Sequence, residues 1–398
     1  MSSVAVVGAG AAGLVASIFA ASGGADVHLI ERTADGGKKI LISGGGRCNI
    51  LPSVLAPERF VTGSPAHLMR GMLRSWPLHE QQEFFEDDAG IPLALEEETG
   101  KLFPRSNKAR DVRDGLLALA KARGVAIQFN TSVIGLERAG EAWVIKTDHG
   151  DVTADRVIMA TGGLSVPLTG SDGTGLRLAA NLGHRLIDTY PALTPLLGDG
   201  SHTSLSGVSL DVRLRGRTGK KMVETSGGFL FTHRGYSGPS VLDISYLATT
   251  DPNAVIRAQW STLDAAAWTR EFESPSSTIL SIVSRHVPAR LAEQLMAEAA
   301  VHHTRRTSDL RRAERTALVE RLTSYVLPWT GDEGFKKAEV TGGGIALDEV
   351  DPRTLESRRC PGLYLCGEML DAFGPIGGHN FAWAWSTGRT AGRAAAQA

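Results

Sequence analysis

Three glycines near the start of the chain are spaced to hold phosphate groups. Gly8, Gly10 and Gly13 form the pattern G-x-G-x-x-G, and Glu31 follows eighteen residues after the last of them. The first glycine allows a tight turn, the second lets the backbone approach a pyrophosphate, and the third lets a helix pack closely on a strand. A carboxylate at Glu31 can accept hydrogen bonds from ribose hydroxyls, and its charge disfavours a 2′-phosphate. These residues predict a site for FAD or NAD rather than NADP.

The elements around these glycines are those that such a site requires. The apolar run at Val4, Val6 and Val7 is typical of a strand inside a parallel sheet. A helix is predicted over residues 11–22, and its N-terminal amides would face the pyrophosphate. A second strand over 27–30 leads to the acidic residue. We therefore expect the dinucleotide to contact Gly8, Gly10, Ala11, Ala12, Gly13, Glu31 and Arg32.

A second glycine cluster lies in LISGGGRCNI, residues 41–50. Three side chains in a row are missing, so the main chain can pass against a ligand, and its amides can serve ring or phosphate oxygens. Arg47 either pairs with an anion or is a solvated charge. Cys48 either protonates a substrate or forms a flavin adduct, or it is an inert buried thiol. From this segment we predict Gly44, Gly45, Gly46 and Arg47 as cofactor-binding, and Cys48 as a catalytic candidate.

The remaining dinucleotide-fold signals are spread along the chain, which favours FAD over NAD. VAIQFN, WVIKT and DRVIMATGG read as strands, and GLYLCGEMLDAFGPIGGHNF near the C-terminus reads as strand, acidic loop, glycine pair and helix. A helix beginning near Asn380 would direct its positive end at flavin N1 and the C2 carbonyl, where reduced flavin is negative. The further predicted cofactor-binding residues are Val133, Ala160, Thr161, Gly162, Gly367, Glu368, Asp371, Gly377, Gly378, His379, Asn380 and Phe381.

The middle of the chain predicts an insertion. Residues 191–258 show short alternating strands separated by turns, as in a small barrel, and 259–335 show a helical pattern in which Pro288 opens a helix. We predict a discontinuous FAD domain, 1–190 with 336–398, an inserted β-rich domain over 191–258 and a helical one over 259–335. The arginine-rich run from 302 to 322 is either a solvated helix face or an anion or RNA contact surface. His233 is either a proton donor at the flavin or a structural histidine.

Five segments together resemble one bacterial family. They are ADGGKKILISGGGRCN, GKLFPRSNKARDV, GGFLFTHRGYSGPSVLDIS, AEVTGGGIAL and GLYLCGEMLDAFGPIGGHNFAWAWSTG. The chain resembles the HI0933-like FAD-binding flavoproteins, which include aminoacetone oxidase-like and BaiN-like proteins. The resemblance implies an α/β fold: a two-dinucleotide-binding, Rossmann-like FAD domain with an inserted β-barrel-like domain and a small helical domain.

The resemblance also places the predicted residues in roles. It implies an adenosine-diphosphate site at the first glycine turn and Glu31, and a flavin cradle built from the Ser43–Asn49 loop and residues 367–380. The resemblance adds Lys39, Ser43 and Asn49 as cofactor-binding residues. The chain departs from the family at 50–53, where Ile-Leu-Pro-Ser replaces the usual x-Thr-Asn continuation, and at His379, where the family often has tyrosine. Both departures lie near the expected active site, so we do not assign the substrates of the family to this chain.

Composition narrows the class of protein. Lys plus Arg number 42 and Asp plus Glu 43, so the net charge of −1 argues against a dedicated nucleic-acid-binding protein. Three cysteines without a Cys-x-x-Cys pair suggest reduced thiols in the cytoplasm. No apolar run is long enough to span a membrane. There is a single G-x-G-x-x-G, so we expect no dedicated NAD(P)H domain. The oligomeric state is left open, and no metal site is expected.

We therefore expect an FAD-dependent oxidoreductase that transfers hydride between flavin N5 and a small organic substrate. Either the substrate reduces the flavin, as in an oxidase, or NAD(P)H docks transiently as reductant. The alternatives are a flavoenzyme that reduces uracil in RNA to dihydrouridine, and a flavin-binding protein without turnover.

Overall fold

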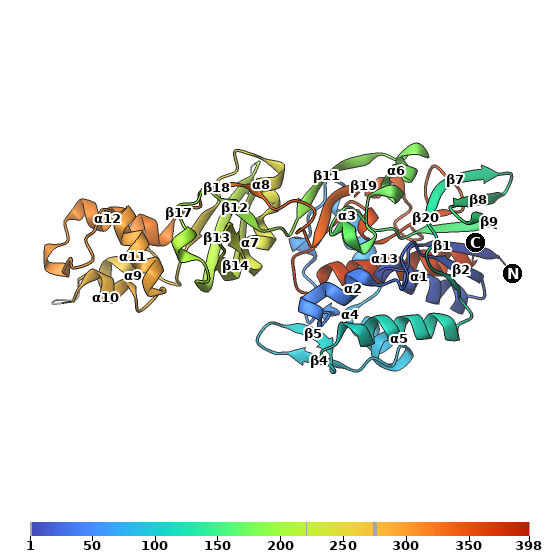
Figure 1. The fold of residues 1–398 in the computed structure, drawn as a ribbon, viewed down its shortest axis with the longest axis horizontal. Helices are drawn as coiled ribbons and strands as arrows, with labels where there is room; N and C mark the ends of the chain where they lie inside the picture. The colour runs from blue at the N-terminus through green and yellow to red at the C-terminus, as the bar shows by residue number, and fades with distance from the viewer. Residues whose placement is uncertain (1, 220, 274–276, 398) are drawn as a thin grey trace. The chain divides into compact units, whose positions relative to one another are not determined.

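A computed structural model describes residues 2–219, 221–273 and 277–397 (Figure 1). The chain divides into two compact units. The first unit combines Met1–Tyr190 with Glu339–Ala398, and the second is Pro191–Ala338. The second unit holds both the β-rich and the helical segment, and their separation into two domains stays a prediction.

The first unit is built on a five-stranded parallel sheet in the order β20-β10-β1-β2-β6. Its strands are β1 (Ser3–Val7), β2 (Asp26–Ile30), β6 (Ala126–Gln128), β10 (Arg156–Met159) and β20 (Leu363–Leu365). Apolar residues fill both faces, and Val6 and Ile158 are fully buried. The predicted strand–turn–helix–strand at the N-terminus is confirmed, with α1 over Ala11–Ser22. The result is a Rossmann-type α/β core.

Helix α13 (His379–Gln397) runs beside α1 (Figure 1). Two small residues allow this close approach, because an added Cβ at Gly388 would lie 2.4 Å from the Ala12 carbonyl oxygen and one at Gly392 would lie 2.3 Å from that of Ala16. The predicted C-terminal helix thus begins one residue before Asn380, and it packs on the helix that follows the first glycine turn.

Smaller elements complete the first unit. Its further helices are α2 (Lys38–Ile42), α3 (Ala66–Arg74), α4 (Leu78–Glu83), α5 (Ala109–Ala122) and α6 (Thr174–Asn181). Strands β3 (Leu51–Pro52), β5 (Lys101–Pro104) and β4 (Leu93–Glu96) form one small sheet, β7 (Val133–Ala139), β8 (Ala142–Thr147) and β9 (Gly150–Ala154) another, and β11 (Leu186–Ala192) pairs with β19 (Val340–Ile345). The WVIKT segment is β8, so it lies in a separate antiparallel sheet and not in the parallel one.

The second unit contains a seven-stranded sheet in the order β17-β16-β13-β14-β15-β12-β18. Its strands are β12 (Leu196–Gly198), β13 (Ser209–Thr218), β14 (Lys221–Phe231), β15 (Gly235–Ser237), β16 (Arg257–Gln259), β17 (Tyr325–Val326) and β18 (Trp329–Asp332). Phe229, Phe231 and Trp260 pack in its core. The last two strands come after the helices, so the sheet draws on residues beyond the predicted β-rich range.

Helices of the second unit are α7 (Pro239–Ile244), α8 (Tyr246–Thr250), α9 (Ala265–Glu271), α10 (Ile279–Val283), α11 (Ala289–Glu298) and α12 (Arg312–Thr323). Pro288 caps α11 and is not its first residue. The arginine-rich run is helical only from Arg312, so the expectation of a helix across the whole run was wrong. Arg305, in the non-helical part, pairs with Glu314 at 2.8 Å, which helps to hold that segment against the start of α12.

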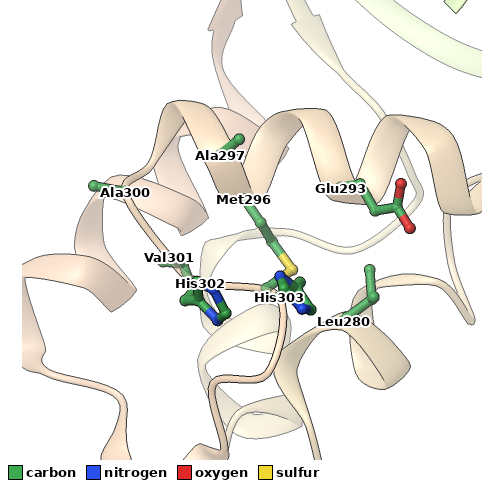
Figure 2. Close-up of a pocket in the computed structure, with 8 residues that line it drawn as sticks. All are labelled: Leu280, Glu293, Met296, Ala297, Ala300, Val301, His302 and His303. Atoms are coloured by element: carbon green, nitrogen blue, oxygen red, sulfur yellow. The ribbon is translucent and has the colours of Figure 1, made fainter.

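A surface pocket of about 590 Å³ lies between α10, α11 and the residues after α11 (Figure 2). The His302 and His303 rings lie 4.1 Å apart at its edge. None of the predicted cofactor residues lines it. In the described parts of the chain, no group of three or more His, Cys, Asp or Glu side chains is placed to hold a metal ion. No described helix has the length and apolar character needed to cross a bilayer.

Candidate functional site

The turn between β1 and α1 has the shape that a diphosphate requires. An added Cβ at Gly13 would lie 1.8 Å from the Gly8 carbonyl oxygen, and one at Gly8 would lie 2.7 Å from that of Ala160. A Cβ at Gly10, by contrast, would meet no heavy atom within 4 Å. Gly10 is also the N-cap of α1, with no side chain capping the helix. The first and third glycines therefore serve packing, and the second leaves open space at the positive end of a helix.

Glu31 lies directly beside this turn. Its carboxylate accepts hydrogen bonds at 2.7 Å from the Ala9 amide on one oxygen and from the Thr33 amide and hydroxyl on the other. These contacts fix the orientation of the carboxylate, and Oε2, which accepts a single hydrogen bond, keeps a lone pair for a ribose hydroxyl. Thr33 was not predicted, because nothing in its own sequence context marks it. Arg32 pairs with Asp172 at 2.5 Å.

The middle strand reaches the same turn. β10 ends at Met159, and Ala160, Thr161 and Gly162 follow it past Gly8. The Thr161 hydroxyl lies 3.1 Å from the Met369 sulfur, and Gly367 lies against Ala12, since an added Cβ would be 2.8 Å from the Ala12 Cβ. The residues predicted from the middle and the end of the chain thus meet those predicted from its start. Val133 is the first residue of β7, and the preceding Thr131 amide donates to the Glu31 carbonyl.

The predicted glycine loop adopts a left-handed backbone conformation at three successive residues. Gly44, Gly45 and Gly46 have φ values of 54°, 67° and 86°, and an added Cβ at Gly45 would meet nothing within 4 Å. Cys48 also has a positive φ of 59°, which is strained for a residue with a side chain. Its thiol is fully buried, and burial raises the pKa of Cys48 to about 12, although a hydrogen bond with Ser43 opposes this.

Arg47 is held by protein groups. Its guanidinium lies 3.9 Å from the centre of the Phe103 ring, pairs with Glu96 at 2.9 Å and donates to Asn107 at 3.0 Å. These contacts tie the glycine loop to the small β3–β5–β4 sheet. Contact between Arg47 and the cofactor stays a prediction.

Lys39 and Glu368 form the charged centre of the site. The Lys39 ammonium contacts the Glu368 carboxylate at 2.5 Å and the Ser165 hydroxyl at 2.6 Å. Ser165 donates to the same carboxylate at 2.5 Å, and the Thr341 amide does so at 2.9 Å. Burial works to raise the pKa of Glu368, but Lys39 and these hydrogen bonds hold it below its usual value. Ser165 and Thr341 were missed, because only the tertiary fold brings them to Glu368.

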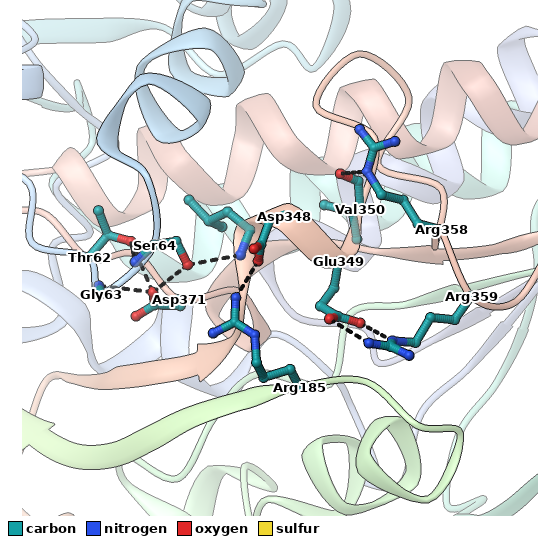
Figure 3. Close-up of polar contacts among 11 residues, drawn as sticks. Thr62, Gly63, Ser64, Arg185, Asp348, Glu349, Val350, Arg358, Arg359 and Asp371 are labelled. Carbon is teal, nitrogen blue, oxygen red and sulfur yellow. Dashed lines mark hydrogen bonds and ion pairs between the residues drawn. The ribbon is translucent and has the colours of Figure 1, made fainter.

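Asp371 fixes a loop of the first unit. Figure 3 shows its Oδ2 atom accepting hydrogen bonds from the Ser64 hydroxyl at 2.7 Å, the Gly63 amide at 2.9 Å and the Thr62 hydroxyl at 3.0 Å. The Ser64 hydroxyl in turn accepts from the Leu347 amide. Burial raises the pKa of Asp371 in spite of these donors. Every hydrogen bond described here goes to a protein group, so its predicted contact with the cofactor stays a prediction.

The start of α13 carries polar atoms that lack partners. Gly377 and Gly378 have φ values of 102° and 91°, and His379 follows as the first helical residue. His379 is 6% exposed, yet neither ring nitrogen makes a hydrogen bond of ordinary geometry, and the buried Asn49 Oδ1 lacks one too. Burial lowers the pKa of His379 to about 4, so the imidazole is neutral at neutral pH.

The two residues after His379 make contacts within the protein, one with the loop before α13 and the other within α13. The Asn380 side chain bonds both the amide and the carbonyl of Gly374, at 2.8 and 2.9 Å. Phe381 stacks on Trp385 with ring centres 5.2 Å apart. His233 is exposed in the second unit, between β14 and β15. The catalytic assignments of His233, His379 and Cys48 stay predictions.

These residues fit FAD. The open space at Gly10 suits a diphosphate, Glu31 is oriented for a ribose, and the unpartnered atoms of Asn49 and His379 can exchange hydrogen bonds with a heteroaromatic ring. A buried polar atom without a hydrogen bond costs about 1–3 kcal/mol, so a ring that bonds to Asn49 and His379 would stabilise the protein.

Comparisons with known proteins agree with this interpretation. The chain matches the HI0933-like protein Rossmann domain over residues 2–394. It is 32% identical to the 3-dehydro-bile acid delta(4,6)-reductase of Clostridium scindens, with both chains covered completely. It is 30% identical to the ribosomal RNA dihydrouridine synthase of Escherichia coli strain K12, over 96% of this chain and 95% of that protein.

Solved structures support the fold. The 3-ketosteroid delta1-dehydrogenase of Sterolibacterium denitrificans matches with a TM-score of 0.55 at 14% identity, with all of both chains covered. The 3-ketosteroid-delta4-(5alpha)-dehydrogenase of Rhodococcus jostii matches with a TM-score of 0.50 at 17% identity, over 99% of this chain and 96% of the other. The open glycine turn and the family match over nearly the whole length agree, and the chain belongs to the HI0933-like family of FAD-dependent oxidoreductases.

Proposed function

We propose that this protein uses FAD to reduce a carbon–carbon double bond conjugated to a carbonyl group in a small organic molecule. The observation that carries the proposal is the buried His379 imidazole at the start of α13, whose ring nitrogens make no hydrogen bond of ordinary geometry. Burial lowers its pKa to about 4, although the backbone of Ile376 and Val54 opposes this shift. A neutral imidazole can donate a hydrogen bond to a carbonyl oxygen without losing its proton to it. Such a donor makes the conjugated carbon more electrophilic.

The names of two relatives support this substrate class. One is a delta(4,6)-reductase of a 3-dehydro-bile acid, and the other is a dihydrouridine synthase. A 3-keto steroid with a double bond at C4 is a conjugated ketone, and the 5,6 double bond of uracil is conjugated to the C4 carbonyl. Both names therefore describe reduction of the same kind of bond in otherwise different molecules.

Different residues of the chain are proposed to bind different parts of FAD. When bound, FAD supplies the hydride chemistry. The Gly8–Gly13 turn and Glu31 would hold its adenosine diphosphate part, and Asn49 and residues 377–379 would lie at its ring. The Cys48 thiol, with a pKa of about 12, keeps its proton at neutral pH. It is thus unsuited to act as a thiolate nucleophile.

NAD(P)H is proposed as the reductant, docking transiently where the product later leaves. The electrons and protons of the reaction then balance. NAD(P)H gives up a hydride and becomes NAD(P)⁺, and the substrate gains a hydride at one carbon of the double bond and a proton at the other. The sequence offers a single G-x-G-x-x-G, so a stable second nucleotide site is not part of the proposal.

The test uses matched acceptors. The FAD-loaded protein is reduced without oxygen by NADH or NADPH and then mixed with a cyclic conjugated enone, its saturated ketone or its isolated alkene. The proposal expects the enone alone to restore the absorption of oxidised flavin. Rapid reoxidation by oxygen with peroxide release, and none by enones, would instead establish the oxidase alternative.

RNA modification has weaker support from the structure. Its basis in this chain is the arginine-rich run, in which Arg305 pairs with Glu314 at 2.8 Å and Arg321 lies 3.9 Å from Glu298. Deletion of the gene, followed by nucleoside analysis of total RNA, decides between the two substrates. Loss of dihydrouridine would replace the small-molecule proposal.

A further inference from the structure

Lys101 lies against the predicted flavin cradle, with its side chain beside Gly377 just before α13 begins. It is the second residue of GKLFPRSNKARDV, a segment to which the proposed function gives no role. Residue 101 begins β5, which pairs with β3 and so places it beside the end of the glycine loop. Lys101 is half-buried, and no described residue forms an ion pair or a hydrogen bond with its ammonium. Its neighbour across the strands, Glu96, pairs with Arg47. Hydrogen bonds from Thr99 and Arg47 do most to lower the pKa of Glu96, and the Lys101 charge adds a smaller attraction.

The Lys101 side chain reaches Gly377. An added Cβ at Gly377 would lie 3.4 Å from Lys101 Cε, 3.9 Å from Asn49 Nδ2 and 4.0 Å from His379 Nδ1. One point in the turn before α13 is therefore surrounded by a lysine stem, an amide and an imidazole. Asn49 and His379 are 7% and 6% exposed and carry the unpartnered atoms described above. A lysine stem, the N-terminal end of a helix and buried polar atoms without hydrogen bonds meet there.

We propose that Lys101 contacts the pyrimidine end of the flavin and stabilises its reduced form. A flavin that has taken up two electrons and one proton carries a negative charge shared between N1 and the C2 carbonyl. Departure of a hydride from N5 removes both electrons, and that charge with them. A cation beside this end favours the reduced ring over the oxidised one and raises the reduction potential. The inference rests on the proposed FAD chemistry and names the residue that tunes it.

Substrate binding is the competing role for Lys101, and two measurements without substrate separate the two roles. The reduction potential of bound FAD is measured against a reference dye during slow anaerobic reduction. The dissociation constant for sulfite is measured by loss of flavin absorption, because sulfite adds to N5 and leaves a negative charge over N1 and the C2 carbonyl. Both report on charge at the ring and neither requires knowledge of the natural substrate.

The variants are Lys101→Met, Lys101→Gln and Lys101→Arg, with Lys121→Met as a control at an exposed lysine of α5. Lys101→Met and Lys101→Gln should weaken sulfite binding at least tenfold. They should also lower the equilibrium ratio of reduced to oxidised FAD by at least tenfold. This corresponds to a fall in the reduction potential of about 30 mV for a two-electron couple. Lys101→Arg should stay within about threefold of wild type, which is about 0.6 kcal/mol on the logarithmic scale. Lys121→Met should match wild type.

Each outcome has a distinct meaning. An unchanged potential and sulfite constant in FAD-saturated Lys101→Met and Lys101→Gln would overturn the inference, even if turnover fell, and would leave substrate binding as the role of Lys101. If wild-type protein bound no FAD at all, the proposed function would fail first. A variant purified without FAD is measured after saturation with added FAD, so weak retention does not prevent the comparison.

Discussion

Lys39 and Glu368 lie 329 residues apart in the chain, and their side chains form an ion pair with 2.5 Å between Nζ and Oε2. The pair joins α2, which follows the second strand, to the segment that follows β20. Ser165 and Thr341 add bonds from two further segments to the same carboxylate. Four separate parts of the first unit are thus fixed at one carboxylate beside the predicted cofactor site.

Lys39→Met should destabilise the protein most at neutral pH. Glu368 would then be a partly buried carboxylate without its cation, and we expect the free energy of unfolding to fall by about 1–3 kcal/mol at pH 7. The wild-type pair holds the pKa of Glu368 below its usual value, so its contribution is present at neutral pH and is lost as the pH falls through that lowered pKa. The two unfolding curves should converge only below that lowered pKa, where the carboxyl is protonated in both proteins.

Urea unfolding at several pH values measures this difference, and a double-mutant cycle with Glu368→Gln tests its origin. Lys39→Met should cost less in the Glu368→Gln background, because no carboxylate is left unpaired. An equal cost in both backgrounds would mean that Lys39 stabilises the protein through packing and not through Glu368.

Gly10→Val should remove FAD without unfolding the protein. Gly10 has φ −80° and ψ −170°, which any residue can adopt, and an added Cβ meets no protein atom within 4 Å. The side chain would instead occupy the space assigned to the diphosphate. We expect colourless protein whose free energy of unfolding, measured without FAD, changes by no more than about 1 kcal/mol, the size of a capping effect.

Gly13→Val is the matched contrast. There the Cβ would lie 1.8 Å from the Gly8 carbonyl oxygen, so the variant should fail to fold. Flavin absorbance relative to protein absorbance and circular dichroism distinguish the two outcomes. Yellow, FAD-saturated Gly10→Val protein would show that the diphosphate is bound elsewhere.

Local patterns in the sequence were sufficient to predict the elements that surround the candidate site. The first glycine turn, α1 and the start of α13 follow from spacing within short segments, because each glycine and each apolar residue acts on its near neighbours. Ser165, Thr341 and Lys101 could not be assigned in this way, since their positions depend on which strands pair. The same reason explains β17 and β18, which return to the sheet after the helices, and WVIKT, whose apolar alternation suits either sheet.

His379 should make the protein without FAD less stable as the pH falls from above 6.5 towards 4. Its folded pKa of about 4 is below the ordinary 6.5, so in this range the unfolded chain binds a proton that the folded protein does not. The loss of stability from this group alone should reach about 3 kcal/mol. His379→Tyr, which introduces the residue frequent in the family, removes the ionisable imidazole and should flatten the pH dependence.

The exposed His67 provides the control, since His67→Tyr should leave the slope of wild type unchanged. Unfolding free energies at pH 7, 6, 5 and 4.5 are compared as differences from wild type, so that other titrating groups cancel. A His379→Tyr slope equal to that of wild type would show that burial does not lower the pKa of His379, and the proposal of a neutral donor would lose its support.

Cys48 should be unreactive towards thiol reagents in the native protein. Burial raises its pKa to about 12 and leaves no exposed surface. The thiolate fraction at pH 8 is then lower by about three orders of magnitude than for a free cysteine of pKa about 8.5. Cys366 is equally buried, and its pKa is also raised to about 12, so Cys360, which is half-buried, should supply the first reacting thiol.

Titration with a chromogenic disulfide before and after denaturation counts these thiols, and Cys360→Ser identifies the early one. We expect at most one thiol to react in native wild-type protein, none in native Cys360→Ser, and two in that variant after denaturation. Fast labelling of native Cys360→Ser that Cys48→Ala abolishes would reveal an accessible thiolate at Cys48. The residue would then be suited to covalent chemistry at the flavin.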